Sequence, residues 1–207
     1  MPSPAARRAW LLVLLLSTCP TTVALAQDGT PRPAPAIDLA PGTTELFAQV
    51  GAARGVELFH SSPGHNYVVQ TLGWGRILSA PHGPGFLRGQ FEWAMEATPL
   101  FWQYDPSRVY AFAFTPLIWR WNFTPSGRVA PYFEIAGGGI WSSDPLPART
   151  TTANWTAHGG FGLRIALRGR QALLVGYRLH HISNGNRLDY NPGVNANMLY
   201  FGWSVLR

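Results

Sequence analysis

The feature that most constrains the fold is a two-residue alternation of apolar and polar side chains along most of the chain. In the stretch 153–168, the odd positions are apolar or glycine, and the even positions include Asn154, Thr156, His158, Arg164 and Arg168. Successive side chains of a β-strand point to opposite faces, so this stretch predicts a strand with one apolar and one polar face. The stretch 86–97 shows the same pattern.

Eight such runs cover the chain from residue 44 onward. Proline and glycine turns separate them, as at Ser62-Pro63-Gly64 and Pro125-Ser126-Gly127. Each run is at least as long as the ~9–11 residues that a tilted strand needs to cross a bilayer. The runs predict an all-β fold, an eight-stranded antiparallel β-barrel over 44–207, with strands near 44–58, 65–79, 86–99, 108–122, 129–141, 153–168, 171–183 and 195–207.

Alternation alone does not separate a transmembrane β-barrel from a soluble barrel of the lipocalin kind, whose apolar face points inward. Aromatic residues near strand ends favour the membrane, because they suit the interfacial girdles of outer-membrane barrels. Two groups have this placement: Trp119, Trp121 and Phe123, and Phe101, Trp102 and Tyr104.

The polar faces also favour a transmembrane barrel, because they combine acids with bases as a side-chain-filled lumen would. The acids are Glu92, Glu96 and Glu134, and the bases are Arg88, Arg164 and Arg178. The final strand is similar to the C-terminal strand of outer-membrane proteins, although it ends in Arg207 instead of an aromatic residue. Its apolar face carries Leu199, Phe201, Trp203 and Val205.

The N-terminal segment predicts export. Arg7 and Arg8 precede an apolar stretch, and small residues end at Ala26, which predicts a signal peptide over 1–26. A lipoprotein anchor at Cys19 is the competing interpretation. Residues 27–43 are rich in proline and alanine and predict an extended tether. Cys19 would leave with the signal peptide, so the mature chain would contain neither a disulfide nor a reactive thiol.

The formal charge of +6 comes from arginine, since the chain contains no lysine. Arginines scattered among the strands of an exported protein indicate anionic lipid or lumenal ion pairs, and argue against nucleic acid as a partner. The turn residues His60, His65 and His82 have no carboxylate at ligand spacing, so we expect neither a metal nor a cofactor. Gly137-Gly138-Gly139 lies within a strand and predicts close packing of the barrel wall.

A candidate catalytic pair ends the seventh predicted strand. His181 and Ser183 are two residues apart, so they share one face at a Cα separation of roughly 7 Å. A histidine beside a serine is the arrangement of a base and its nucleophile. The same pair also suits a structural role as turn-capping polar residues. We expect His180 and His158 to face the lumen and to be structural.

The last hairpin supplies a third group. If it is symmetric, Asn195 lies across from Ser183 and Asn197 lies across from His181. Asn195 could then hold the imidazole tautomer, as the third member of a catalytic triad does, but an amide cannot neutralise the imidazolium. Asp189, in the preceding loop, is the alternative acid, and a site without an orienting group is the remaining alternative.

The His-x-Ser-Asn motif on the penultimate strand, followed by an Asn-Pro-Gly loop and a final strand, resembles the outer-membrane lipid A 3-O-deacylases (PagL type, acyloxyacyl hydrolase-like). The resemblance implies an eight-stranded barrel in the bacterial outer membrane with lipid A as substrate. It implies His181 as general base, Ser183 as nucleophile, and Asn184 and Gly185 in the oxyanion region. The family pattern has a glutamate twelve residues after the serine, where this chain has Asn195.

These features together predict an outer-membrane serine esterase that removes an ester-linked acyl chain from lipid A or lipopolysaccharide. The alternative is a non-catalytic outer-membrane barrel that binds lipopolysaccharide or has a structural role. A soluble periplasmic binding barrel is a third hypothesis. Acyl transfer to another lipid is a variant of the enzymatic hypothesis, and the sequence leaves a homodimer open.

Overall fold

The structure, a computed structural model, describes residues 37–207, most of which belong to eight β-strands. The predicted signal peptide, 1–26, and residues 27–36 of the predicted tether lie outside the described residues. A short 3-10 helix, η1 (Gly85–Leu87), lies between the second and third strands. The strands are β1 (Thr44–Val56), β2 (Asn66–Ile77), β3 (Gly89–Asp105), β4 (Val109–Phe123), β5 (Val129–Ser142), β6 (Ala153–Ala166), β7 (Gln171–Ser183) and β8 (Val194–Leu206).

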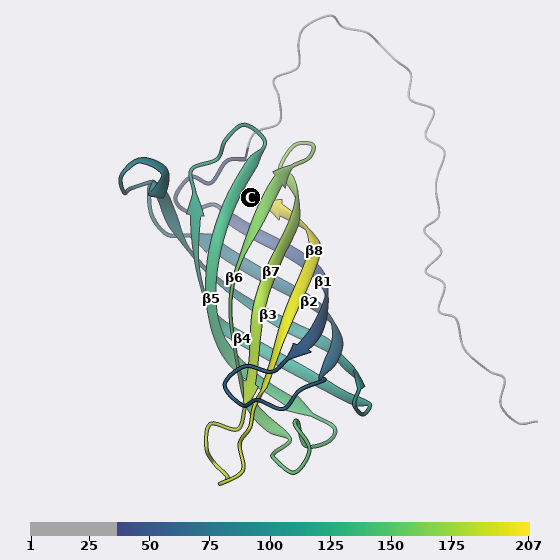
Figure 1. Ribbon diagram of the computed structural model, residues 1–207. Helices are drawn as coiled ribbons and strands as arrows, with labels where there is room; N and C mark the ends of the chain where they lie inside the picture. Colours follow the sequence, from purple (N-terminus) through teal and green to yellow (C-terminus); the bar gives the residue numbers. More distant parts are fainter. Residues whose placement is uncertain (1–36) are drawn as a thin grey trace, which may run out of the picture. The chain divides into compact units, whose positions relative to one another are not determined.

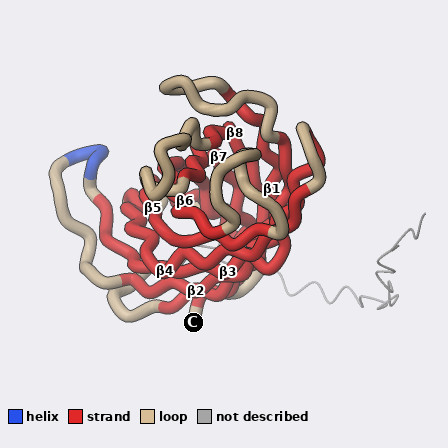
Figure 2. The backbone as a smooth tube through the Cα atoms, turned by 90° about the horizontal axis from the view of Figure 1, so that it is seen from below, coloured by secondary structure: helices blue, strands red, loops and turns tan. Residues whose placement is uncertain are grey.

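The strands form one closed antiparallel barrel, which confirms the predicted fold class (Figure 1). Each strand pairs with its neighbour in the sequence, and β1 closes the ring by pairing with β8, as the view from below shows (Figure 2). Closure leaves no unpaired strand edge. The C-terminus lies at the upper end in Figure 1, and the β1–β2 and β7–β8 loops lie at the lower end.

No helix within residues 37–207 is long and apolar enough to cross a membrane.

The outer wall of the barrel is apolar and the lumen is polar, the opposite of a soluble lipocalin-type barrel. On β6, Trp155 and Phe161 are exposed on the outside, whereas Thr156, His158 and Arg164 are buried inside. Trp119, Trp141 and Trp203 are likewise exposed on other strands. Since large apolar side chains on a water-facing wall would be costly, the outer wall faces lipid.

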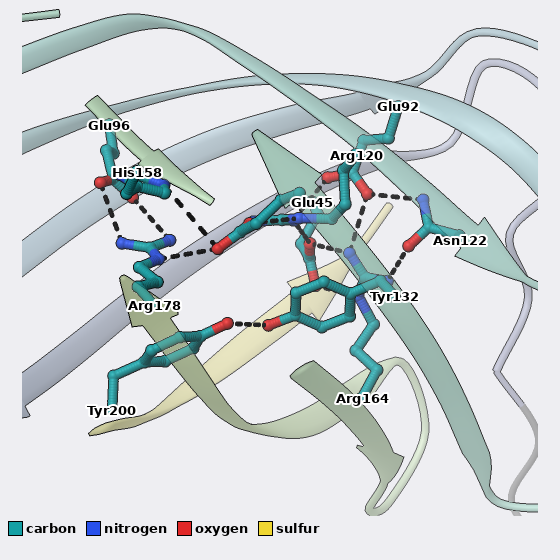
Figure 3. Close-up of polar contacts among 11 residues, drawn as sticks. Glu45, Glu92, Glu96, Arg120, Asn122, Tyr132, His158, Arg164, Arg178 and Tyr200 are labelled. Carbon is teal, nitrogen blue, oxygen red and sulfur yellow. Dashed lines mark hydrogen bonds and ion pairs between the residues drawn. The ribbon is translucent and has the colours of Figure 1, made fainter. Parts of the chain in front are cut away.

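An ion-pair network fills the middle of the lumen (Figure 3). Arg164 Nη2 lies 2.6 Å from Glu45 and 2.9 Å from Glu92, and Arg178 Nε lies 2.7 Å from Glu134. Buried charges are tolerated when they are paired and hydrogen-bonded in this way. The lumenal network comprises Glu45, Glu92, Glu96, Glu134, Arg120, Arg164 and Arg178.

The arginines of this network differ from the prediction at two positions. Arg88, which we expected in the lumen, lies exposed in the β2–β3 loop because β3 begins only at Gly89. Its place is taken by Arg120, which lies between two outward tryptophans of β4 and points inward to Glu92 at 2.8 Å.

Phe101 also differs from the prediction, because it is buried inside the barrel and is only 1% exposed. The pairing of β3 with β4 shifts between Thr98 and Phe101, so the alternation changes phase there. Trp102 and Tyr104 are exposed on the outer wall, as a girdle requires.

At the lower end, an apolar cluster replaces the ion pairs in the lumen. Ile182 of β7 and Ala196 and Met198 of β8 belong to this cluster, together with Tyr67 and Phe101. Because alternate side chains of a strand point to opposite faces, burial of these residues turns their sequence neighbours to the outer wall. The candidate catalytic residues are among those neighbours.

Candidate active site on the outer wall

His181 and Ser183 lie on the outer wall at the lower end of β7, on either side of Ile182. Ile182 is completely buried in the lumen, whereas His181 and Ser183 are partly exposed. Upstream on the same face, Val175 and Leu179 extend toward the middle of the membrane wall. The pair therefore lies where an apolar wall meets the loops at the end of the barrel.

Asn195 lies directly across from His181, not across from Ser183 as the symmetric hairpin predicted. Asn197 is correspondingly opposite Leu179. The difference arises because Val194, which we placed in the loop, pairs with Ile182. This moves the register by two residues, and a shift of two leaves every side chain on its predicted face.

The register allows a hydrogen bond between the two side chains. His181 Nδ1 lies 2.8 Å from Asn195 Oδ1. Asn195 Nδ2 donates to the backbone carbonyl of Leu58, in the β1–β2 loop, at 3.0 Å. A carbonyl oxygen can only accept, so the amide must turn its NH2 to Leu58 and its oxygen to His181. His181 Nδ1 therefore carries a proton, and Nε2 is the basic nitrogen.

The β1–β2 loop supports the site at a second point. The backbone N–H of Ser62 donates to the carbonyl of Gly193 at 3.0 Å. Gly193 has a φ of 67° and lies against the imidazole, because a Cβ at this position would come within 3.0 Å of His181 Cε1. Glycine is needed here both for the left-handed backbone and for the close approach to the ring.

The loop after Ser183 is held by asparagines. Asn184 is completely buried; its backbone N–H donates to Asn191 Oδ1 at 3.1 Å, and its side-chain NH2 donates to Tyr190 at 3.2 Å. Gly185 has a φ of 65° and packs on the indole of Trp155. Trp155 is paired with Ser183 across β6 and β7.

The predicted site residues are thus only partly brought together. His181 and Asn195 share a hydrogen bond, and Gly185 lies near Ser183 in the chain. Asp189 is exposed in the loop and, within residues 37–207, makes no side-chain hydrogen bond or ion pair to His181. In the same part of the chain, no hydrogen bond joins Ser183 Oγ to His181 Nε2.

Sequence reasoning missed Leu58 and Asn191. Leu58 acts through its backbone carbonyl, so its side chain gives no signal. Asn191 belongs to the Asn-Pro-Gly loop, and its hydrogen bond to Asn184 spans seven residues without a regular period. In the described part of the chain, no three His, Asp or Glu side chains are grouped to hold a metal ion.

The sequence model of one family, lipid A 3-O-deacylase (PagL), matches residues 72–204. The match covers more than half of the chain and includes β7, most of β8 and the loop between them. The chain belongs to the PagL family. Membership and the barrel fold place the protein in the bacterial outer membrane, as the sequence predicted.

Solved structures confirm the fold of this PagL-family chain. The outer-membrane enzyme PagL is 17% identical, with a TM-score of 0.52, over 76% of this chain and 97% of that chain. Neisserial surface protein A is 16% identical, with a TM-score of 0.55, over 79% of this chain and 98% of that chain. No curated protein matches.

Proposed function

We propose that the protein hydrolyses the 3-O-linked acyl ester of lipid A, with Ser183 as nucleophile, His181 as general base and Asn195 as the group that orients His181. The observation that carries this proposal is the His181–Asn195 hydrogen bond, which leaves Nε2 as the basic nitrogen on the face that Ser183 shares. Membership of the lipid A 3-O-deacylase family supports the choice of substrate.

The reaction begins when His181 Nε2 accepts the proton of the Ser183 hydroxyl and Oγ attacks the ester carbonyl carbon. The tetrahedral intermediate collapses as the bond to the sugar oxygen breaks, and His181 returns the proton to that oxygen. Water, deprotonated by His181, then attacks the acyl-serine. This step releases the fatty acid and restores Ser183.

The oxyanion of the intermediate needs hydrogen-bond donors. The Asn184 backbone N–H already donates to Asn191 Oδ1, so it is not free for this role. In the described part of the chain, the Gly185 N–H makes no hydrogen bond, and we assign it to the oxyanion. Asn184 and Asn191 then hold the loop that presents Gly185.

A hollow beside Ser183 suits the acyl chain that is cleaved. Its volume is about 270 Å³, and its walls include Phe114, Trp141 and Trp155. Gly138 and Gly139 line its floor, so the glycine run leaves room on this part of the wall. Trp155 of β6 lines the hollow and is paired with Ser183 of β7, so an acyl chain whose ester lies at Ser183 can enter the hollow across Trp155.

Mass spectrometry of lipid A from cells that express the protein tests this function. We expect lipid A to lose one ester-linked chain, and Ser183→Ala to restore that chain. Ser126→Ala, in the β4–β5 turn, is the matched control and should remain active. Full activity of Ser183→Ala would exclude the mechanism, and unchanged lipid A in every case would favour a non-catalytic barrel that binds lipopolysaccharide.

A further inference from the structure

Arg54 points outward from β1 near the lower end of the barrel, although most of the outer wall is apolar. It is exposed, while its neighbour Ala53 is buried in the lumen. In the described part of the chain, its side chain makes no ion pair or hydrogen bond. Asn197 of β8 lies directly opposite Arg54. The Cβ atoms of such a pair are about 5 Å apart, so both side chains can reach one ligand.

Asn197 is already oriented for this role. Its Oδ1 accepts a hydrogen bond from the Tyr177 hydroxyl at 2.6 Å, so its NH2 group remains as a donor on the exposed side. The amide NH2 and the guanidinium of Arg54 thus present only donors. Adjacent donors of this kind suit a phosphate, which Arg binds with two parallel hydrogen bonds.

Arg54 also lies close to the candidate active site. His181 of β7 pairs with Asn195 of β8, and Asn195 pairs with Val56 of β1. Val56 lies two residues from Arg54 on the same strand. Two strand spacings across and two residues along the strand put the Cα atoms of Arg54 and His181 about 12 Å apart. One lipid headgroup can therefore contact Arg54 while its ester lies at Ser183.

From Arg54 toward the upper end of the barrel, the outer face of β1 carries the small side chains Ala52, Val50 and Ala48. Two hollows of about 630 and 470 Å³ lie over them and share Val50, Gln70 and Phe201. We call this continuous depression the β1 groove; from Ala52 to Ala48 it runs for about 13 Å along the strand. It is distinct from the hollow beside Trp155, whose lining includes no residue of β1 or β8.

We propose that Arg54 and Asn197 bind a phosphate of the lipid substrate and that the β1 groove holds a second acyl chain of the same molecule. This inference rests on the proposed function, because it places the rest of the lipid whose ester faces Ser183. Charge complementarity argues for the headgroup, and the apolar lining of the groove argues for the chain. Arg54 and Asn197 are thus binding residues and take no part in the chemistry.

Binding measurements on full-length Ser183→Ala protein in detergent micelles test the phosphate contact without turnover. The probes are lipid A, lipid A stripped of its phosphates, and inorganic phosphate alone. We expect Arg54→Gln to weaken lipid A binding about tenfold and to leave the stripped lipid unaffected. Arg108→Gln, an exposed arginine of the β3–β4 turn, is the matched control and should change neither affinity.

Equal affinity of both lipids for the Ser183→Ala protein, or no effect of Arg54→Gln, would overturn the phosphate contact. Tight binding of inorganic phosphate that depends on Arg54 would also overturn the assignment to a lipid. Because the assay involves no hydrolysis, it separates the two proposals. If binding depends on Arg54 but the active protein cleaves no ester, the proposed lipid-binding site is supported and the proposed esterase function is wrong.

Ala52→Phe, in the same background, tests the β1 groove by filling it from the outer wall. We expect about fivefold weaker binding of both lipids, whereas Ile135→Phe on the exposed face of β5 should change neither. Unchanged affinity in Ala52→Phe would mean that the β1 groove does not hold a second acyl chain. A dimer in micelles that Ala52→Phe dissociates would assign the groove to a second copy of the chain and overturn the proposal.

Discussion

The lumenal network and the outer-wall site are both built from polar side chains on the same strands, but they differ in how completely those side chains are paired. In the lumen, Arg164 donates to Glu45, Glu92 and Asn122, and none of these four residues is more than 1% exposed. On the outer wall, Ser183 and Arg54 stay accessible, and their side chains have no such partners within residues 37–207. Complete pairing stabilises a fold, whereas an incompletely paired group remains available to a ligand.

The two regions also differ in their dependence on loops. Strand residues alone make the lumenal ion pairs, so strand register determines them. The outer-wall site needs the β1–β2 loop, because Leu58 orients Asn195 and Ser62 holds Gly193. We therefore expect substitutions in the lumen to change stability, and substitutions on the outer wall to change activity.

The largest effect is expected for His181→Ala. Loss of the general base should lower kcat/KM for lipid A on the order of 10⁴-fold, the upper part of the range for general acid–base catalysis. The free energy of unfolding should change little, because His181 is only partly buried. His82→Ala, at an exposed turn, serves as control. A His181→Ala protein that is active but unstable would mean that this outer-wall residue serves stability and not activity.

Arg164→Met should have the opposite effect: it should lower the free energy of unfolding and leave the activity of the folded protein nearly unchanged. It removes the guanidinium that lies 2.6 Å from Glu45 and 2.9 Å from Glu92 and leaves Arg120 as their remaining partner. Loss of one member of a buried ion pair typically costs about 3–5 kcal/mol. Guanidinium unfolding in micelles, followed by tryptophan fluorescence, measures this loss. The kcat of the molecules that remain folded should stay within about twofold, since the network does not reach the outer wall.

Asn195→Ala tests the link between the loop and the site. The imidazole loses the acceptor that fixes its tautomer, and a hydrogen bond of this kind is worth about 1.5–3 kcal/mol, or roughly 10- to 100-fold in kcat/KM. Asn66→Ala is a matched control, since Asn66 also makes two side-chain hydrogen bonds, to Gly55 and Asp105. Equal losses of activity in both variants would mean that Asn195 has only a structural role.

Alternation of side chains was sufficient to predict the barrel, the strand faces and the outward position of His181 and Ser183. This prediction is robust because the two-residue error in the β7–β8 register left Asn195 on the correct face. It was wrong where the period breaks. Phe101 points inward because the pairing of β3 shifts, and the aromatic neighbours of Arg120 concealed its lumenal position.

The hydrogen bonds that hold the outer-wall site in place could not be predicted, because they depend on backbone groups in irregular loops. The carbonyl of Leu58 and the N–H of Ser62 would be present with almost any side chains, so composition and periodicity give no signal for them. Gly193 is the exception. A glycine beside a proline marks a turn, although its contact with the His181 ring becomes evident only in three dimensions.

The smallest effect concerns His65, which closes the β1–β2 loop. His65 Nδ1 lies 2.6 Å from Gln103, and Nε2 lies 3.0 Å from Ser62, the residue that holds Gly193. Burial lowers the pKa of His65 below its ordinary value, although Gln103 and Asp105 oppose the shift. The open loop therefore binds a proton more readily than the closed loop does.

It follows that closure of the loop is favoured above a pH of about 6.5, the ordinary pKa of histidine, and becomes less favourable as the pH falls below it. NMR titration of the His65 ring should give a midpoint below about 6.5. Activity should decline modestly over the same range, and His65→Gln should abolish that part of the decline because glutamine does not titrate. A midpoint at or above 6.5 would mean that the loop is open in the membrane, and the support of Gly193 by Ser62 would then be lost.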